Sequence, residues 1–242
     1  MPKSTKSASS IENQLLAALS TKYYKHILPL LEPVSFVLGD ILYHPQAAIR
    51  YVYFPHRTLI SIVNVLKDES MVEMTIVGSE GMLGTALLSG DDRSPHQAIV
   101  QVADGGVRMK SQVFKEELKR NKELRRLVLR YSQSLFVQVA QTAACNSLHP
   151  IVQRLARWLL MTRDRLDSDT FLLTHGFIAL MLGVQRAGVT IAAGSLQKAG
   201  TIEYRRGKIT ILRLNALEEA ACECYATIKA ETAQLLDQYK KT

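Results

Sequence analysis

The sequence predicts an α+β protein with a β-rich N-terminal half and a helical C-terminal half, and three observations lead to this fold class. Short runs rich in β-branched and aromatic residues, separated by prolines and glycines, fill residues 34–109. A stretch without proline or glycine follows at 114–145, with apolar residues at helical spacing. Two short helical patterns and a β-prone hairpin then occupy residues 175–212. At 242 residues and 47% hydrophobic content, the chain suits one large or two modest domains.

Composition narrows the class of protein further. Residues 1–10 (MPKSTKSASS) are biased toward Ser, Thr and Lys, which predicts a disordered tail and not a secretory signal. No apolar run approaches the roughly 18 residues that a membrane span needs. Three cysteines do not form a disulfide framework. We therefore expect a cytoplasmic protein without a membrane partner. The net charge of +8 is compatible with a polyanionic partner but does not identify one.

Residues 11–113 are predicted to form a β-roll or jelly-roll-like sandwich. Strand-like runs lie at 51–54 (YVYF), 58–66 (TLISIVNVL), 71–77 (MVEMTIV) and 97–103 (QAIVQVA). The second and third runs are separated by the polar turn KDES, so we expect them to pair as a hairpin. Short strands at this spacing are typical of an all-β roll.

Residues 114–146 are predicted to form one long dimerisation helix. Apolar residues recur at helical spacing, among them Leu124, Val128, Tyr131 and Leu135. About 30 residues at 1.5 Å each give a helix of roughly 45 Å, which is too long for one small β domain to cover. A second copy of the helix is the simplest partner, and Leu135→Glu is then expected to give monomers. The alternative is a helix that packs wholly within its own chain.

Residues 147–242 are predicted to form a winged helix-turn-helix domain. After Pro150, an amphipathic run at 152–161 and a polar loop at 163–170 precede two helical patterns within 175–198. Small Ala179 on the first helix and Gly183 at the turn, flanked by apolar residues, are the helix-turn-helix pattern. The polar residues of the second helix lie away from its apolar stripe. Those predicted to read base edges are Gln185, Arg186 and Thr190, and those predicted to contact the DNA backbone are Gln197 and Lys198.

A basic hairpin follows the two helices. The run IEYRRGKITIL at 202–212 reads as two short strands around a glycine turn, with Arg205, Arg206 and Lys208 near the tip. Cations on such a wing are suited to contact phosphates. Each piece has a plain structural alternative, since helical pairs often only pack and basic turns are often only solvated. The two in direct succession are much more specific for DNA binding. Residues 216–238 are predicted to return to helix.

The order of these parts resembles the Crp/Fnr transcription regulators over nearly the whole chain. The segment "LGVQRAGV…LQKAGTIEYRRGKITI" carries the strongest similarity, with Gly183, Arg186 and Val189 on the family's pattern. The resemblance implies a cyclic-nucleotide-binding-like roll, a homodimer on double-stranded DNA with a palindromic operator, and RNA polymerase as a partner. Arg186 would be the main guanine-reading residue. Ala187 stands where the family usually has glutamate, and Ile191 where a second arginine is frequent, so the operator need not follow the family consensus.

The resemblance also locates the effector pocket, but with altered residues. The family holds a cyclic nucleotide with a glycine-glutamate step and an arginine-serine step. Here Gly84-Thr85 and His96-Gln97 stand at these places. Without a buried cation, a cyclic phosphate would lose its charge-assisted bonds, so cAMP is not an expected effector. A shifted register through Arg93-Ser94 is the alternative.

Other cofactors are not expected from the sequence. Iron–sulfur members of the family have a cysteine group near the N-terminus, whereas the cysteines here are Cys145, Cys222 and Cys224. The pair Cys222-x-Cys224 alone is too sparse for a metal site and is interpreted as buried thiols. Haem would need an axial ligand among His44, His56 and His96, and lone histidines are more often surface residues.

Two classes of function are therefore open. We expect a sequence-specific homodimeric transcription regulator with an unknown effector. The alternative is a β-roll interaction module, a regulatory subunit whose C-terminal domain contacts protein instead of DNA. An enzyme is not expected, because the sequence has no P-loop, GxSxG or HExxH motif. The run GSEGMLG at 78–84 is interpreted as a turn of the roll and not a phosphate loop.

Overall fold

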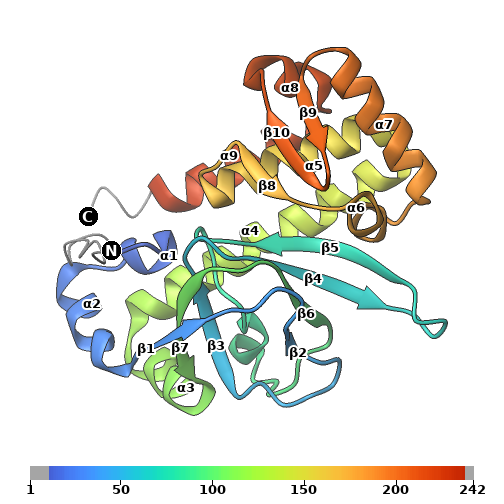
Figure 1. The fold of residues 1–242 in the computed structure, drawn as a ribbon. Coiled ribbons are helices and arrows are strands. Elements are labelled where there is room, and N and C mark those ends of the chain that lie inside the picture. The colour runs from blue at the N-terminus through green and yellow to red at the C-terminus, as the bar shows by residue number, and fades with distance from the viewer. Residues whose placement is uncertain (1–10, 238–242) are drawn as a thin grey trace, which may run out of the picture.

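A computed structural model describes residues 11–237 and confirms the predicted α+β class (Figure 1). The predicted tail at 1–10 and residues 238–242, at the end of the last predicted helix, lie outside the described residues. A β-roll forms the N-terminal half, a long helix follows it, and a helical domain with a small sheet lies above both in Figure 1.

The roll consists of two antiparallel sheets, as its short alternating strands predict. One sheet has the strand order β1-β7-β3 and the other β2-β6-β4-β5. The strands are β1 (Glu32–Ser35), β2 (Ile41–Tyr43), β3 (Tyr51–Pro55), β4 (Leu59–Val65), β5 (Met71–Val77), β6 (Gln97–Val102) and β7 (Gly105–Lys110). Strands β4 and β5 pair as the predicted hairpin, which projects beneath the C-terminal domain in Figure 1. The 3-10 turn η2 (Thr85–Ser89) joins β5 to β6.

Short helices that the strand pattern did not predict close one end of the roll. They are α1 (Gln14–Ala17), α2 (Thr21–Ile27) and the 3-10 turn η1 (Leu28–Leu30). Asn13 caps α1 with its side-chain oxygen, and its amide donates to the carbonyls of Pro55 and Gly81, both at 2.9 Å. This buried amide ties the start of the described chain to the roll.

The predicted single helix from residue 114 is two helices, α3 (Ser111–Arg120) and α4 (Lys122–Leu148). The break lies at Asn121, whose backbone is extended and whose side chain accepts from the Leu124 amide at 3.0 Å. A capping asparagine starts a new helix here because it satisfies an amide that an uninterrupted helix would pair with its own backbone. The prediction of one helix over 114–146 is therefore wrong at its N-terminal end.

The long helix α4 presents different faces to the two halves of the molecule. Its first turns bury Leu124, Leu127, Val128 and Tyr131 in the core of the roll. Later turns bury the mostly polar residues Ser134, Gln138, Thr142 and Cys145. A further face leaves Leu129 50% exposed and Phe136 65% exposed. The apolar stripe seen in the sequence therefore divides between an internal face and a free one.

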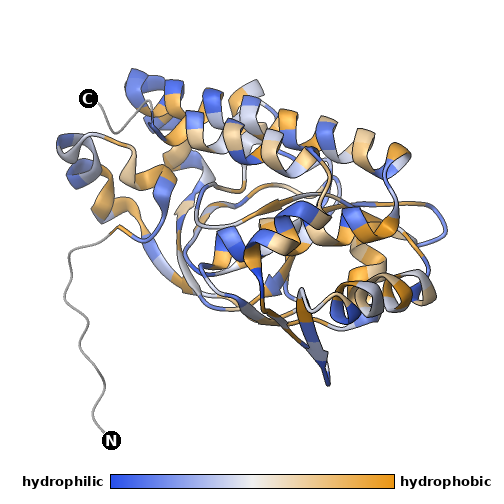
Figure 2. Cartoon of the chain, turned by 90° about the horizontal axis from the view of Figure 1, so that it is seen from above, coloured by the Kyte–Doolittle hydropathy of each residue, from blue (hydrophilic) through white to orange (hydrophobic). Residues whose placement is uncertain are grey.

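The C-terminal domain surrounds a three-stranded sheet of order β8-β10-β9. Its elements are α5 (Ile151–Leu166), β8 (Thr170–Leu172), α6 (His175–Leu182), α7 (Arg186–Lys198), β9 (Ile202–Arg205), β10 (Lys208–Ile211), α8 (Leu214–Ala220) and α9 (Cys224–Asp237). Two predictions need correction. The polar loop predicted at 163–170 begins as the last turn of α5, which ends at Leu166, and it ends where β8 starts at Thr170. The helix predicted at 216–238 is broken at residues 221–223. Figure 2 shows hydrophilic and hydrophobic residues alternating along these helices.

Among the described residues, no single helix has both the length and the apolarity that a membrane span needs. Only α6 and α7 taken together pass by composition, and they are bent by 108° from each other.

One of the two large apolar cores is shared by the roll and the C-terminal domain. Leu59, Val63 and Ile76 of the β4–β5 hairpin pack with Trp158, Met181 and other apolar residues of the C-terminal domain. Polar bonds cross the same boundary. Trp158 Nε1 donates to Glu73 at 2.8 Å, and the Arg165 guanidinium pairs with Glu80 at 2.8 Å with both groups buried. The roll therefore fixes the position of α5.

Glu73 makes the stability of this boundary depend on pH. Burial raises the pKa of the Glu73 carboxyl to about 7, although hydrogen bonds from Ser61 and Trp158 oppose the shift. A carboxyl with a raised folded-state pKa binds more protons when folded, so stability falls as pH rises from about 4.5 to 7.

We expect Glu73→Gln to remove this dependence, because the amide keeps the shape without a buried charge. The variant should be about 1–3 kcal/mol more stable than the wild type at pH 8 and about equal at pH 5. Chemical denaturation at both pH values and one protein concentration measures the difference. A difference that is the same at both pH values would contradict a buried titrating carboxyl.

Candidate DNA interface and effector cavity

Helices α6 and α7 form the predicted helix-turn-helix. Thr174 caps α6, accepting from the Phe177 amide at 3.2 Å. Gly183 ends α6 with a φ of 61°, a left-handed conformation that glycine adopts without the strain of a side chain. Ala179 is buried between the helices, and Val189, Ala192 and Leu196 bury the inner face of α7. The glycine turn therefore sets α7 across α6 as the spacing predicts.

The outer face of α7 carries the residues predicted to read bases. Gln185 is the N-cap residue of α7, and Arg186 is its first helical residue. Both are exposed, and the Arg186 guanidinium makes no hydrogen bond or ion pair with any described residue. Thr190 is exposed too, although its hydroxyl donates to the Arg186 carbonyl and lies 3.0 Å from His175 Nδ1. Ile191 beside them is 70% exposed.

The basic hairpin is a two-stranded wing attached to α7. Arg206 and Gly207 form its turn with φ values of 52° and 78°, the positive pair of a tight two-residue hairpin. Arg205 and Lys208 face each other as the last pair of β9 and β10, and all three cationic residues are exposed. Gln197 Oε1 accepts from the Tyr204 amide at 2.8 Å, so this predicted backbone contact also joins α7 to the wing. Lys198 is exposed in the last turn of α7.

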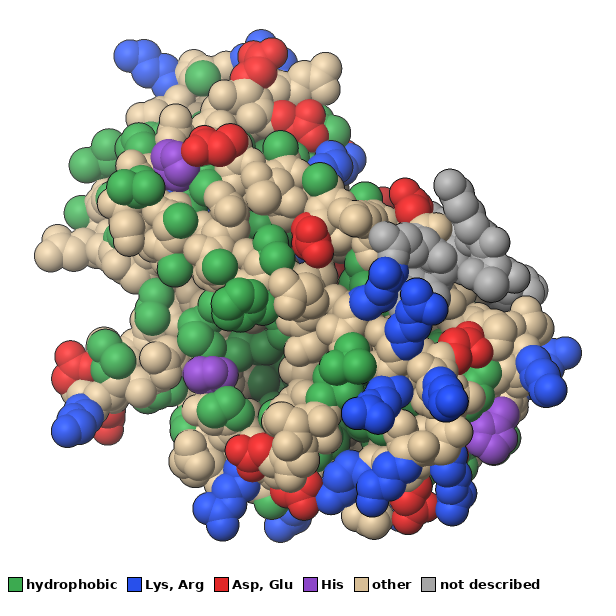
Figure 3. Space-filling view, turned by 180° about the vertical axis from the view of Figure 1, so that it is seen from behind, with side chains coloured by type: hydrophobic (Ala, Val, Ile, Leu, Met, Phe, Trp, Pro, Cys, Tyr) green, Lys and Arg blue, Asp and Glu red, His purple; other side chains and the backbone are tan. Residues whose placement is uncertain are grey.

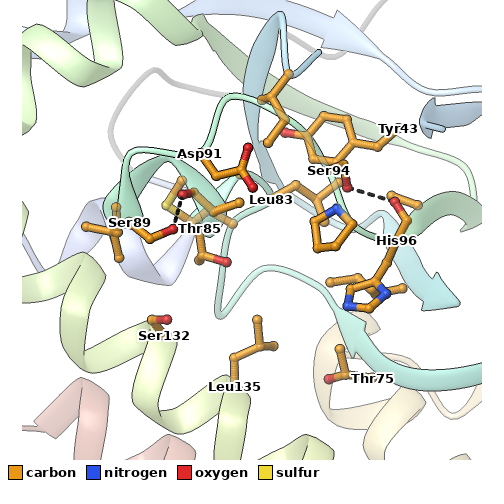
Figure 4. Close-up of a pocket in the computed structure, with 18 of the residues that line it drawn as sticks. Tyr43, Thr75, Leu83, Thr85, Ser89, Asp91, Ser94, His96, Ser132 and Leu135 are labelled. Carbon is orange, nitrogen blue, oxygen red and sulfur yellow. Dashed lines mark hydrogen bonds between the residues drawn. The ribbon is translucent and has the colours of Figure 1, made fainter. Parts of the chain in front are cut away.

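A cavity of about 670 Å³ opens between the roll and α4. Figure 3 shows the hollow with hydrophobic side chains gathered around it. The roll contributes Tyr43, Thr75 and Leu83, and α4 contributes Ser132 and Leu135 (Figure 4). The wall that α4 supplies includes Phe136, part of the free face of that helix. The cavity therefore touches both the roll and the helix that leads to the C-terminal domain.

Some of the predicted pocket residues line the cavity, and the others lie outside its wall. Gly84, Thr85, Ser94 and His96 line the cavity. Ser94 is buried and donates to the His96 carbonyl at 2.7 Å. Arg93 is exposed and is not part of the wall, so the structure does not favour the shifted register. Gln97 also lies outside the wall, within β6.

The described wall of the cavity contains no lysine or arginine. Its charged residue is Asp91, an anion. Burial lowers the pKa of His96, which favours the neutral ring near pH 7. A phosphate group placed here would meet a carboxylate and no compensating cation, whereas an uncharged apolar molecule would lose little on entering.

The sequence did not reveal the contribution of α4 or of Thr75 to this cavity. In the sequence, Thr75 is only one position of an alternating strand pattern, and Ser132 is one polar position of a helix. In the sequence, apolar Leu129 and Phe136 belong to a broad helical stripe. That stripe is the one signal for the contribution of α4 to the cavity.

Comparison with known families supports the assignment of the C-terminal domain. Residues 153–220 match the family described as Crp-like helix-turn-helix domain. The match includes α6, α7 and the wing. None of the curated protein sequences matches the chain at a significant level.

Solved structures share the fold over most of the chain. FixK2 from Bradyrhizobium japonicum is similar with a TM-score of 0.69 at 14% identity, over 79% of this chain and 98% of that one. A Crp/Fnr-family regulator of Thermus thermophilus gives 0.64 at 22% identity, over 78% and 98%. The c-di-GMP-responsive regulator CLP of Xanthomonas campestris gives 0.64 at 13% identity, over 79% and 99%. The chain therefore has the fold of Crp/Fnr-type transcription regulators with a Crp-like helix-turn-helix domain.

Proposed function

We propose that this chain, with its Crp/Fnr-type fold, is a cytoplasmic homodimeric transcription regulator that binds a palindromic DNA operator and acts with RNA polymerase. The observation that carries the proposal is the unpaired Arg186 on the outer face of α7, beside a wing with three exposed cations. Enzymatic activity is no part of the proposal, and the similar structures belong to transcription regulators.

The geometry supports separate roles for α7 and for the wing at the DNA. A helix of this kind enters the major groove with its N-terminal residues toward the base edges. Gln185 and Arg186 occupy that end of α7, and Arg is suited to a bidentate contact with guanine O6 and N7. Arg205, Arg206 and Lys208 would hold phosphates beside the groove, as would Lys198 and the amide nitrogen of Gln197.

The second base contact would be apolar. Ala187 and Ile191 lie one turn apart on α7 and are exposed, so they contribute nothing to the core. Apolar side chains in the major groove contact the methyl group of thymine. We therefore propose an operator half-site with one essential guanine and a neighbouring thymine contacted by Ile191.

The roll is proposed to sense an uncharged, largely apolar effector. A ligand in the cavity would touch Thr75, whose hydroxyl accepts from the Gln138 amide. The Gln138 oxygen in turn accepts from Arg165 of α5 at 2.8 Å. These contiguous contacts give a ligand a route to bias the position of the C-terminal domain.

Selection of bound duplexes from a random DNA library by the purified protein tests the proposal. We expect enrichment of one palindrome with half-sites about one helical turn apart. The alternative of a protein-binding regulatory module would be favoured by two results together. No DNA sequence would be enriched, and binding to DNA would not depend on salt.

Cyclic AMP is expected not to bind at micromolar concentration. The cavity has no described cation in its wall, and Asp91 would repel the cyclic phosphate. Titration calorimetry on the purified protein measures this directly. Micromolar binding that is lost in Arg93→Ala would restore the shifted register through Arg93-Ser94.

Replacing Arg205, Arg206 and Lys208 together with alanine should weaken binding about equally for all DNA sequences. Each phosphate contact removed should make the slope of log affinity against log salt shallower by about 1. Fluorescence anisotropy at several salt concentrations measures both effects. Lys119, Arg120 and Lys122 are a matched control, because they are exposed cations at the far end of the molecule. A loss confined to the selected operator would mean that the wing reads bases.

A further inference from the structure

Four potential metal ligands meet where α4 ends and the α8–α9 junction packs against it. Cys145 and His149 come from the end of α4, and Cys222 and Cys224 come from the junction. One donor atom from each residue lies within 4.8 Å of all the others. The three thiols are free and buried, and they form a cluster of their own, separate from the two large apolar cores.

Two of the distances within this cluster are close to those between ligands of a single tetrahedral ion. Zinc bonds of about 2.3 Å to sulfur and about 2.0 Å to nitrogen place neighbouring ligand atoms about 3.5–3.8 Å apart. Cys145 Sγ lies 3.4 Å from Cys222 Sγ, and Cys224 Sγ lies 3.5 Å from His149 Nδ1. A small outward movement of the two closest thiols would admit the ion.

The groups around the cluster orient the ligands. His149 Nε2 lies 3.3 Å from the Glu223 carboxylate, and this pairing directs Nδ1 toward the thiols. A carboxylate on the far nitrogen is the usual support for a metal-bound histidine. The Gln141 amide donates to Cys224 Sγ at 3.1 Å and so fixes the position of the sulfur.

Buried positive charge lies close to the cluster. Three thiolates and one zinc ion carry a net charge of −1. The guanidinium of Arg157, 2% exposed, donates to Thr142 one turn before Cys145 on α4. This placement offsets the charge that the occupied site would bring into the interior.

We propose that Cys145, His149, Cys222 and Cys224 bind one zinc ion, which joins the end of α4 to the α8–α9 junction of the C-terminal domain. Three thiolates and one imidazole at tetrahedral spacing are a closed set that leaves no open position for catalysis. The ion is therefore structural, and it fixes the hinge at His149–Pro150, where α4 passes into α5. Its effect on operator binding rests on the proposed function, but zinc binding itself does not.

A disulfide between Cys145 and Cys222 is the competing arrangement, since their sulfurs are adjacent. In a disulfide-bonded protein, Cys224 and His149 would have no shared role. The same holds for Gln141 and Glu223, which support them. Zinc uses all four side chains. Mass spectrometry of the native protein separates the two, because a disulfide lowers the mass by two hydrogens.

Metal content of the full-length protein, purified with a reductant, tests the site. We expect about one zinc per chain by elemental analysis, and replacement by Co²⁺ with the strong visible absorption of a tetrahedral thiolate site. The double variant Cys222→Ser, Cys224→Ser should lose the metal, and His44→Ala, which alters an exposed histidine of the roll, should retain it. Competition with a chromophoric chelator should show affinity about 10–100-fold lower in Glu223→Gln.

His149→Cys keeps the proposal testable if the serine variants do not fold. A fourth thiolate should retain the metal and strengthen the sulfur-to-cobalt charge-transfer band. An unchanged spectrum in this variant would show that the imidazole is not a ligand. Less than about one tenth of a zinc per chain with no cobalt spectrum, or metal retained by the folded double serine variant, would overturn the site. Zinc binding without operator binding would leave this inference intact and refute the proposed function.

Discussion

Phe136→Glu is expected to convert the protein into monomers that no longer hold the operator. Phe136 is 65% exposed, and Leu129, 50% exposed, lies seven residues before it on the same face of α4. This spacing brings a second copy of the helix against both residues in a two-fold pair. A glutamate in that seam would meet its own copy across the axis.

The loss of the dimer should have a large effect on DNA binding. Two linked half-site contacts exceed one by roughly 10²–10⁴ in affinity, and a monomer forfeits that gain. Light scattering measures the association state, and fluorescence anisotropy on the selected operator measures the affinity.

Gln112→Glu is the matched control for this variant. It adds the same charge to an exposed position on α3, outside α4. It should remain dimeric and bind the operator. A dimer that persists in Phe136→Glu, at the concentration where the wild type is dimeric, would remove α4 as the interface.

The structure changes which residue of α4 is the best choice for this experiment. The sequence stripe favours Leu135, but Leu135 is half-buried and packs against the core of the roll, whereas Phe136 is 65% exposed. Leu135→Glu would therefore disturb the core of the roll and the seam together. A helical period places apolar residues on one side of a helix, but it does not say where the roll stops covering that side.

Local chemistry accounts for what the sequence predicted well. Gly183 ends α6 and Arg206-Gly207 turns the wing because each backbone conformation is set by neighbouring residues. The exposed face of α7 followed from the same short segment. Such features need no knowledge of distant parts of the chain.

Contacts between distant segments explain what the sequence did not predict. Asn121 breaks the long helix because its side chain caps α4, although the apolar pattern continues across it. Cys145 and Cys222 are 77 residues apart, and only the packing of α9 along α4 brings their thiols together. In the sequence the pair Cys222-x-Cys224 stands by itself, and it is only half of a four-residue cluster.

Arg186→Ala is expected to remove the preference for one base pair in each half-site. The guanidinium is exposed at the start of α7 and has no described partner, so its removal should cost the fold little. The lost bidentate contact should weaken operator binding by roughly 1–3 kcal/mol per half-site, which is about 5–150-fold for each. Binding to random DNA should stay nearly intact, since it rests on phosphate contacts.

Two further variants separate base reading from simple loss of charge. Arg186→Lys should rescue poorly, because an ammonium group cannot make the two-pronged contact with guanine. Lys198→Ala removes a cation from the last turn of the same helix and should weaken binding to all sequences alike. Anisotropy titrations with the selected operator and with duplexes altered at the guanine measure each effect. If Arg186→Ala binds as tightly and as selectively as the wild type, α7 does not read the operator through this residue, because no other described side chain at that end of the helix offers a planar pair of cationic donors.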